Sequence, residues 1–219
     1  MGNVPDMAEL RATLRVSVVC DAMDVAAPGV RAWLGPDVTA LDPGRTLVGW
    51  AFPVRLERVH ARPETPYVGL LAALDAFGPD DVWCVSSADD HAAALWGELL
   101  STRGVATGAA GAVIDGHIRD VRLIRELGFT CFARGVLPLD INGRYEVAGF
   151  GDPVELCGVP VAARDLVVGD EDGVAVVPAA HVADVVARAL AKAEAENGMR
   201  DSVAEGVSPS EAYRRHRVL

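Results

Sequence analysis

The chain has 219 residues, of which 51% are hydrophobic and 5% aromatic, and its formal net charge is −11. This length and apolar content suffice for a full hydrophobic core, and we expect a single domain over residues 1–219. The acidic balance, without a basic cluster long enough to follow a phosphate backbone, argues against direct nucleic-acid binding.

The N-terminal residues show no basic stretch followed by an apolar core, and no apolar run has the length of a membrane span. We therefore expect a cytoplasmic protein without membrane contact. The four cysteines are widely spaced, form no Cys-x-x-Cys pair and mostly lie in apolar runs, which predicts reduced core residues. Lys192 is the single lysine and lies far in sequence from the candidate site described below, which disfavours Schiff-base chemistry.

In chain order, the first third of the sequence predicts helices and strands in alternation. Apolar residues at helical spacing predict one or two helices over 7–25. An apolar run predicts a strand over 46–59, which Pro53 should place at an edge or at a bulge. A short helix over 67–77 and a buried strand over 81–87 follow, and His91 in the next loop could face the site.

The central segment continues this alternation. It predicts a helix from Gly97 to residue 104 or beyond, a strand over 111–115, a helix over 119–127 and a strand over 130–133. Alternating strands and helices of this kind indicate a parallel sheet. In this scheme Asp115 is a structural residue before a turn at Gly116, with a supporting role at the site as the alternative. His117 is exposed in that turn, with a role in the pocket as the alternative.

The last third is rich in strands and ends in a long helix. We expect strands over 154–162 and a hairpin over 165–169 and 173–177, whose acidic turn lacks the remaining ligands of a calcium loop. Pro178 should open a helix from 179 to about 205, and one apolar face is expected to consist of Val182, Val185, Val186, Ala189, Leu190 and Ala193.

Two acids and an arginine are placed to converge at one edge of the predicted sheet. Twenty residues separate Glu98 from Arg119, enough for a helix, a turn and a buried strand, and Asp120 follows directly. Ligand crevices of α/β folds usually lie at that edge. On a helix, Arg119 and Asp120 would diverge by about 100° and could not form a simple surface ion pair, so each could serve a different ligand.

The first turn of the central helix offers a second element of a site. If Gly97 begins the helix, the free backbone amides of Glu98, Leu99 and Leu100 would favour a small carboxylate. From the residues alone, the alternative interpretation is structural: a glycine needed for packing and solvated helix starts with ordinary acids.

Four segments carry a resemblance to a known family: Gly97-Glu98-Leu99-Leu100, Gly111-Ala-Val-Ile-Asp-Gly-x-x-Arg-Asp120, Cys157-Gly158-Val159 and Val168-Gly-Asp-x-Asp-Gly-Val174. Together they resemble the 4-hydroxy-4-methyl-2-oxoglutarate aldolase family, which shares its fold with the regulator of ribonuclease activity A (RraA). The resemblance runs in order through nearly the whole chain. It implies an α/β fold, a layered β/β/α sandwich with a long C-terminal helix, assembled as a homotrimer or homohexamer with sites between subunits.

The resemblance also implies an activity and a set of site residues. It predicts a divalent-metal-dependent class II pyruvate aldolase that cleaves 4-hydroxy-4-methyl-2-oxoglutarate, or a related 4-hydroxy-2-oxo acid, and decarboxylates oxaloacetate. Arg119 and Glu98 would be catalytic, and the substrate would be bound by Arg119 and by Gly97, Leu99 and Leu100. Asp120 would bind Mg²⁺, Mn²⁺ or another divalent metal, and Glu196 of a neighbouring subunit would reach the metal's waters, with Glu194 as the alternative.

Two other functions remain open from the sequence. A non-catalytic regulator that binds a ribonuclease can also contain the Arg-Asp pair, although Glu98 and the long C-terminal helix favour the enzyme. A relative with the same catalytic residues but a changed distal pocket could act on a different 2-oxo acid.

Overall fold

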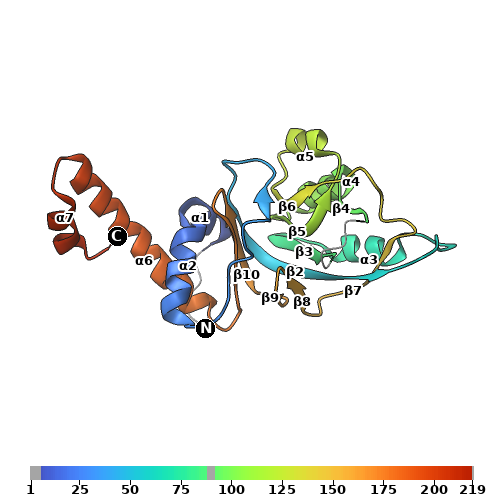
Figure 1. Ribbon diagram of the computed structural model, residues 1–219, viewed down its shortest axis with the longest axis horizontal. Coiled ribbons are helices and arrows are strands. Elements are labelled where there is room, and N and C mark those ends of the chain that lie inside the picture. The colour runs from blue at the N-terminus through green and yellow to red at the C-terminus, as the bar shows by residue number, and fades with distance from the viewer. Residues whose placement is uncertain (1–5, 88–91, 219) are drawn as a thin grey trace.

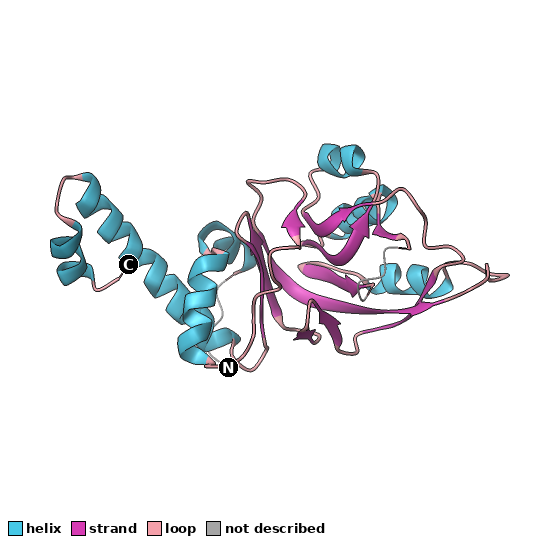
Figure 2. Cartoon of the chain, viewed as in Figure 1, coloured by secondary structure: helices cyan, strands magenta, loops and turns pink. Residues whose placement is uncertain are grey.

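The computed structural model describes residues 6–87 and 92–218 and shows a curved sheet with helices packed on it (Figures 1 and 2). Its helices are α1 (Met7–Thr13), α2 (Val16–Ala26), α3 (Val68–Ala76), α4 (Glu98–Thr107), α5 (Val121–Leu127), α6 (Val182–Ala204) and α7 (Pro209–His216). Its strands are β1 (Thr39–Ala40), β2 (Leu47–Arg58), β3 (Asp81–Ser86), β4 (Ala94–Trp96), β5 (Gly111–Ile118), β6 (Cys131–Val136), β7 (Tyr145–Phe150), β8 (Val154–Leu156), β9 (Val159–Val161), β10 (Leu166–Asp170) and β11 (Gly173–Val177). The expected α/β class is confirmed.

Nine strands form the main sheet in the order β1-β6-β5-β3-β2-β10-β11, with β4 beside β5 and β7 beside β2. Strands β2, β3, β5 and β6 are parallel, with Ala51 opposite Val82 and Trp83 opposite Ala112. Parallel neighbours need a crossover connection, which α3, α4 and α5 help to supply. The predicted parallel portion is therefore confirmed, as is the antiparallel β10–β11 hairpin.

Side chains alternate across the main sheet and fill a core on each of its faces. On one face, Trp83 and Ile114 pack against α3, α4 and α5. On the other face, Cys84 and Val113 pack against the β8–β9 hairpin, which forms a small sheet of its own. The hairpin, the main sheet and the helices make the β/β/α layers that the resemblance implied. All four cysteines are free, as predicted, but only Cys84 and Cys131 are buried in these cores, and Cys20 and Cys157 are partly exposed.

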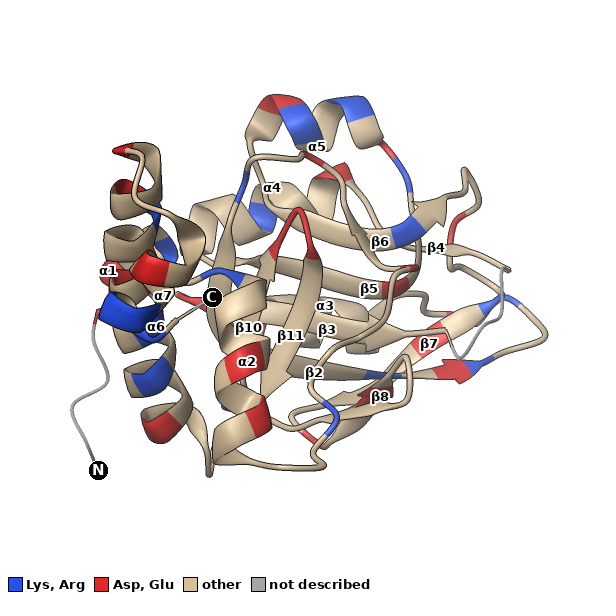
Figure 3. Cartoon of the chain, turned by 60° about the vertical axis from the view of Figure 1, so that its left-hand side comes forward, with Lys and Arg blue, Asp and Glu red and all other residues tan. Residues whose placement is uncertain are grey.

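The N-terminal helices and α6 cover the β10–β11 end of the sheet. The C-terminal part of α6 projects away from the sheet together with α7 (Figure 1). The sequence predicted neither α7 nor this projection. Acidic and basic residues interleave along α6 (Figure 3). Its apolar face is confirmed, with Leu190 partly buried and the other five expected residues buried. No helix in the described part of the chain combines the length and apolarity needed to cross a bilayer.

Pro53 lies inside the sheet, so its predicted edge position is wrong. On one side β2 pairs continuously with β3, and Pro53 lies opposite Cys84. On the other side β2 pairs with β10 through residues 47–50 and with β7 through residues 54–58. Pro53 falls in the gap between these two partners, where its missing N–H removes no ladder hydrogen bond.

Strand β5 is longer than its predicted range of 111–115. It continues to Ile118, because β4 and β6 pair with its last residues on both sides. Gly116 and His117 are therefore strand residues and form no turn, and His117 is half-buried. The helix after β5 begins at Val121 instead of 119, which changes the geometry of the candidate site.

Candidate functional site

The start of α4 and the end of β5 lie beside each other, as the sequence predicted. Gly97 is the N-cap of α4, and the Arg119 amide donates to the Trp96 carbonyl at 3.0 Å. The Ser101 hydroxyl accepts from the Trp96 indole at 2.8 Å and donates to the Gly97 carbonyl at 3.0 Å. These bonds hold the first turn of α4 against the residue that follows β5.

The site leaves little room for a side chain at position 97, where the sequence has Gly97. Its φ of −162° is extended backbone that any residue adopts. A Cβ added there would lie 2.9 Å from Asp120 Oδ2 and 3.3 Å from Arg119 Cγ. A larger residue at position 97 would therefore displace the two side chains that carry the predicted chemistry.

Arg119 and Asp120 form an ion pair, so the prediction that they diverge on a helix is wrong. Arg119 Nε lies 3.6 Å from Asp120 Oδ2, and about two fifths of each side chain is exposed. The reason is that neither residue belongs to α5: Arg119 follows β5, and Asp120 is the N-cap with φ 60° and ψ 31°. Left-handed backbone is strained for a residue with a Cβ and often marks a functional position. The Glu98 amide also donates to Asp120 Oδ2, at 3.4 Å.

Asp140 completes the arrangement, and sequence reasoning missed it. It lies in the loop after β6, with Oδ1 at 3.6 Å from Arg119 Nη2 and 2.8 Å from the Ile141 amide. Its other oxygen accepts from the Tyr67 hydroxyl. This hydrogen bond raises the pKa of Tyr67, because a phenolate beside a carboxylate is disfavoured. No motif surrounds Asp140, so only the fold could bring it to the site.

The predicted residues line one connected hollow. A small cavity of about 70 Å³ is lined by the segment 94–100 together with Arg119, Asp120 and Asp140. It shares Arg119, Asp140 and several leucines with a larger open cavity of about 480 Å³ between α3 and α4. Glu98 borders the small cavity, and its carboxylate accepts from Thr102 at 2.8 Å. The structure thus brings Gly97, Leu99 and Leu100 together with the charged candidates Glu98, Arg119 and Asp120. The roles of these residues stay predictions.

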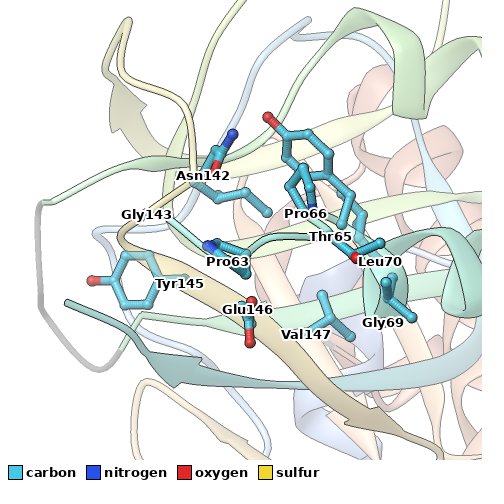
Figure 4. A pocket seen from close by; sticks show the side chains of 13 residues that line it. Pro63, Thr65, Pro66, Gly69, Leu70, Asn142, Gly143, Tyr145, Glu146 and Val147 are labelled. Atoms are coloured by element: carbon cyan, nitrogen blue, oxygen red, sulfur yellow. The ribbon is translucent and has the colours of Figure 1, made fainter. Parts of the chain in front are cut away.

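A neighbouring pocket of about 150 Å³, which shares Leu70 with both cavities, lies between residues 63–70 and 141–147 (Figure 4). Prolines, glycines and apolar side chains form most of its wall, with Glu146 as its acid. This lining contains no arginine, so the pocket does not repeat the arginine–carboxylate chemistry of the main cavity.

The C-terminal acids lie outside this hollow within one chain. Glu196 is held by Arg15 at 3.0 Å and by Lys192 at 3.4 Å, which ties α6 to the N-terminal helices. Glu194 is exposed and has no ion pair among the described residues. The assignment of Glu196 to a neighbouring subunit's site stays a prediction, and Glu194 is the acid with the freer carboxylate. His91 lies outside the described residues.

Asp115 belongs to a different environment, on the face of the sheet that carries the β8–β9 hairpin. It is buried, pairs with Arg134, and accepts from the Ser86 hydroxyl and the Cys157 amide, both at 2.8 Å. Burial alone would raise the pKa of Asp115, but the Cys157 amide, Ser86 and Arg134 outweigh it and lower that pKa. Asp115 lies within a strand and not before a turn, and with Arg134 and Cys157 it also lines an open cavity of about 640 Å³. Its structural role stays a prediction.

The donor set fits a cation that takes few protein ligands. Among the described residues, no group of three or more His, Cys, Asp or Glu side chains could hold a metal ion. The contacts that the described residues make to Asp120 engage Oδ2, so Oδ1 is available in a half-exposed position. Mg²⁺ commonly binds through one or two carboxylates and keeps several waters.

Comparison with known proteins gives a consistent result. Residues 16–176 match the RraA-like family model, described as Aldolase/RraA. A provisionally named 4-hydroxy-4-methyl-2-oxoglutarate aldolase of Halalkalibacterium halodurans is 30% identical over 146 residues, which are 67% of this chain and 69% of the relative. The crystal structure of an uncharacterised protein of Pseudomonas syringae pv. tomato has a TM-score of 0.82 at 26% identity, covering 96% of this chain and 99% of that one. RraAS2 of Streptomyces coelicolor, described as an unusual member of the RraA family of RNase ES inhibitors, has a TM-score of 0.78 at 28% identity, covering 90% and 99%.

Proposed function

The chain belongs to the RraA-like family of aldolases and RraA proteins, and from this premise we propose that it is a divalent-metal-dependent class II pyruvate aldolase. The observation that carries the proposal is the convergence of Arg119, Asp120 and the first turn of α4 on one cavity. The substrate class is a 4-hydroxy-2-oxo acid such as 4-hydroxy-4-methyl-2-oxoglutarate, and oxaloacetate would be decarboxylated through the same enolate.

The charge on the enolate must be stabilised without a Schiff base. The single lysine, Lys192, pairs with Asp21 and Glu196 and does not line the cavity of its own chain. Arg119 would hold the developing enolate oxygen, a preorganised electrostatic role. The amides of the first turn of α4 would orient the substrate carboxylate. A divalent cation held by Asp120 would supply Lewis acidity at the keto oxygen.

Glu98 is the candidate for proton transfer. In the retro-aldol direction the C3–C4 bond breaks, its electron pair forms the enolate, and the proton of the 4-hydroxyl leaves. Glu98 would accept that proton through a water and return one to C3, so that the reaction needs no oxidant or reductant. Support comes from the position of Glu98 at the small cavity, where its carboxylate accepts a hydrogen bond from Thr102.

The assembly remains part of the proposal. A homotrimer or homohexamer would allow Glu196 or Glu194 of one subunit to reach the site of the next. The projecting α6–α7 segment is compatible with such a contact (Figure 1).

The test is pyruvate release from oxaloacetate and from 4-hydroxy-4-methyl-2-oxoglutarate, with Mg²⁺ and with excess chelator. Metal-dependent turnover supports the proposal, and turnover of oxaloacetate alone would keep the enolate chemistry but reassign the aldol substrate. Absence of turnover with either substrate, in a folded and metal-supplied protein, would favour a ribonuclease-binding regulator, the activity described for the family of the Streptomyces protein.

A further inference from the structure

The guanidinium of Arg119 lies between two carboxylates that contact different nitrogen atoms. Its Nε atom lies 3.6 Å from Asp120 Oδ2, and its Nη2 atom lies 3.6 Å from Asp140 Oδ1. Two such contacts define the plane of a guanidinium, because its donors form a rigid fork. The side chains of Arg119 and Asp140 are 37% and 36% exposed, so their ion pair adds little to stability. The pair with Asp140 is therefore better suited to orient Arg119 than to hold the fold.

Both carboxylate oxygens of Asp140 are engaged by the protein. Oδ1 accepts from the Ile141 amide at 2.8 Å in addition to its contact with Arg119. Oδ2 accepts from the Tyr67 hydroxyl. Asp140 differs in this respect from Asp120, whose Oδ1 is available for a cation. The position of the Asp140 carboxylate is thus set by its protein donors, and Tyr67 is the side chain among them that is distant in sequence.

Tyr67 comes from a closely packed part of the fold. It is the N-cap of α3 with φ 67°, a left-handed backbone that a residue with a Cβ adopts where its surroundings impose it. In the first turn of α3, a Cβ added to Gly69 would lie 1.9 Å from the Val147 carbonyl oxygen of β7. The Asn142 side chain, in the wall of the neighbouring pocket (Figure 4), also hydrogen-bonds to Tyr67. Tyr67 therefore presents its hydroxyl to Asp140 from a fixed position.

These contacts connect the start of α3, the loop after β6 and the residue that follows β5. We propose, on the basis of the proposed function, that Tyr67 and Asp140 are positioning residues, which hold the guanidinium of Arg119 where negative charge develops on the substrate. An arginine that is oriented in advance stabilises this charge without reorganisation in the transition state. Tyr67 keeps its proton throughout, and proton transfer remains with Glu98.

The test is the steady-state kinetics of oxaloacetate decarboxylation, with Mg²⁺, for Tyr67→Phe, Asp140→Ala and the double variant. We expect kcat to fall about fivefold in Tyr67→Phe and between about tenfold and a hundredfold in Asp140→Ala. The KM for oxaloacetate should change by less than about twofold, because Arg119 acts on charge that develops in the transition state. Since Tyr67 acts through Asp140, the double variant should be no slower than Asp140→Ala alone.

Tyr213→Phe is the matched control for the loss of a phenol hydroxyl. Tyr213 is 46% exposed on α7 and lines none of the cavities at the site, so this variant should leave kcat and KM unchanged. Asp140→Asn keeps the shape of the side chain and takes the place of Asp140→Ala in the comparison if the alanine variant does not fold. The pH dependence of kcat should have the same shape in Tyr67→Phe as in the wild-type protein.

The outcomes separate the positioning role from the proposed function. Wild-type kcat in both single variants, beside an active wild-type protein, overturns the positioning role and leaves the aldolase intact. A double variant whose loss equals the product of the two single losses shows independent effects and also overturns that role. If Tyr67→Phe abolishes a fall of kcat at high pH, Tyr67 transfers a proton itself and the positioning role is wrong. Absence of turnover in the wild-type protein overturns both proposals.

Discussion

Two arginine–aspartate pairs lie at opposite faces of the sheet, and their aspartates are only five residues apart in the chain. Asp115 pairs with Arg134 on the hairpin side, where only 4% of the Asp115 side chain is exposed. Asp120 pairs with Arg119 on the helix side at 3.6 Å, with 42% of the Asp120 side chain exposed. The first carboxylate is fully satisfied by its neighbours, and the second is left with capacity for a ligand. Both pairs line cavities, so the difference lies in burial and in the carboxylate: a buried, satisfied carboxylate is suited to hold the fold, and one with an uncontacted oxygen is suited to chemistry.

Asp120→Ala tests the functional role of the exposed pair, and it should have the largest effect on activity. Removing the sole carboxylate assigned to the cation should lower kcat/KM for oxaloacetate by roughly a thousandfold or more. The free energy of unfolding should fall by only about 1 kcal/mol, because the side chain is half-exposed but alanine tolerates the left-handed backbone at position 120 less well than aspartate. Steady-state kinetics and urea unfolding measure the two effects, and full turnover by the variant would refute the role of Asp120.

Asp115→Ala should have the opposite profile. It leaves Arg134 without its carboxylate and removes the acceptor of the Cys157 amide, so we expect a loss of about 3 kcal/mol in the free energy of unfolding. Urea unfolding provides the measurement, with Asp120→Ala as the matched acid-to-alanine control. A variant as stable as the control would show that the buried pair does not anchor the hairpin.

Arg119→Lys sharpens the comparison at the site itself. Lysine keeps the charge but loses the planar fork that can address an enolate oxygen and Asp140 together. We expect kcat/KM to fall by about tenfold to a hundredfold at unchanged stability. The matching change at the buried pair, Arg134→Lys, should instead lower stability, and near-wild-type kinetics of Arg119→Lys would argue against an enolate contact.

The pH dependence of stability should also separate the two aspartates. The folded state lowers the pKa of Asp115, so its contribution to stability is present above the unfolded pKa of about 3.9 and is lost as pH falls through the folded value. In Asp115→Asn this part of the acid destabilisation should disappear, while Asp120→Asn should keep it. Urea unfolding between pH 2 and 6 measures the free energy of unfolding of both variants. An equal loss of stability toward low pH in the two variants would contradict the assignment.

Local patterns were sufficient for much of the fold. The apolar period of the long C-terminal helix, the hairpin turn of β10–β11 and the alternation of strands and helices each depend on residues close in sequence. The resemblance located Gly97, Arg119 and Asp120, and the structure brings them together as expected.

The remaining features depend on contacts that are distant in sequence. Pairing by β4 and β6 converts Gly116 and His117 from a predicted turn into strand, and this moves Arg119 and Asp120 out of the helix. Pro53 is tolerated in an interior strand because it lies in the gap between β10 and β7, the two strands that pair with the same side of β2. Asp140 reaches Arg119 only through the loop after β6, which no local signal marks.

Mn²⁺ binding followed by electron paramagnetic resonance, in the presence of oxalate as an enolate mimic, tests the central claim most directly. The wild-type protein and Asp115→Asn should bind Mn²⁺ in an oxalate-dependent manner, and Asp120→Ala should lose this binding. Equal Mn²⁺ binding by Asp120→Ala and the wild-type protein would contradict the assignment of the open pair to metal-assisted chemistry.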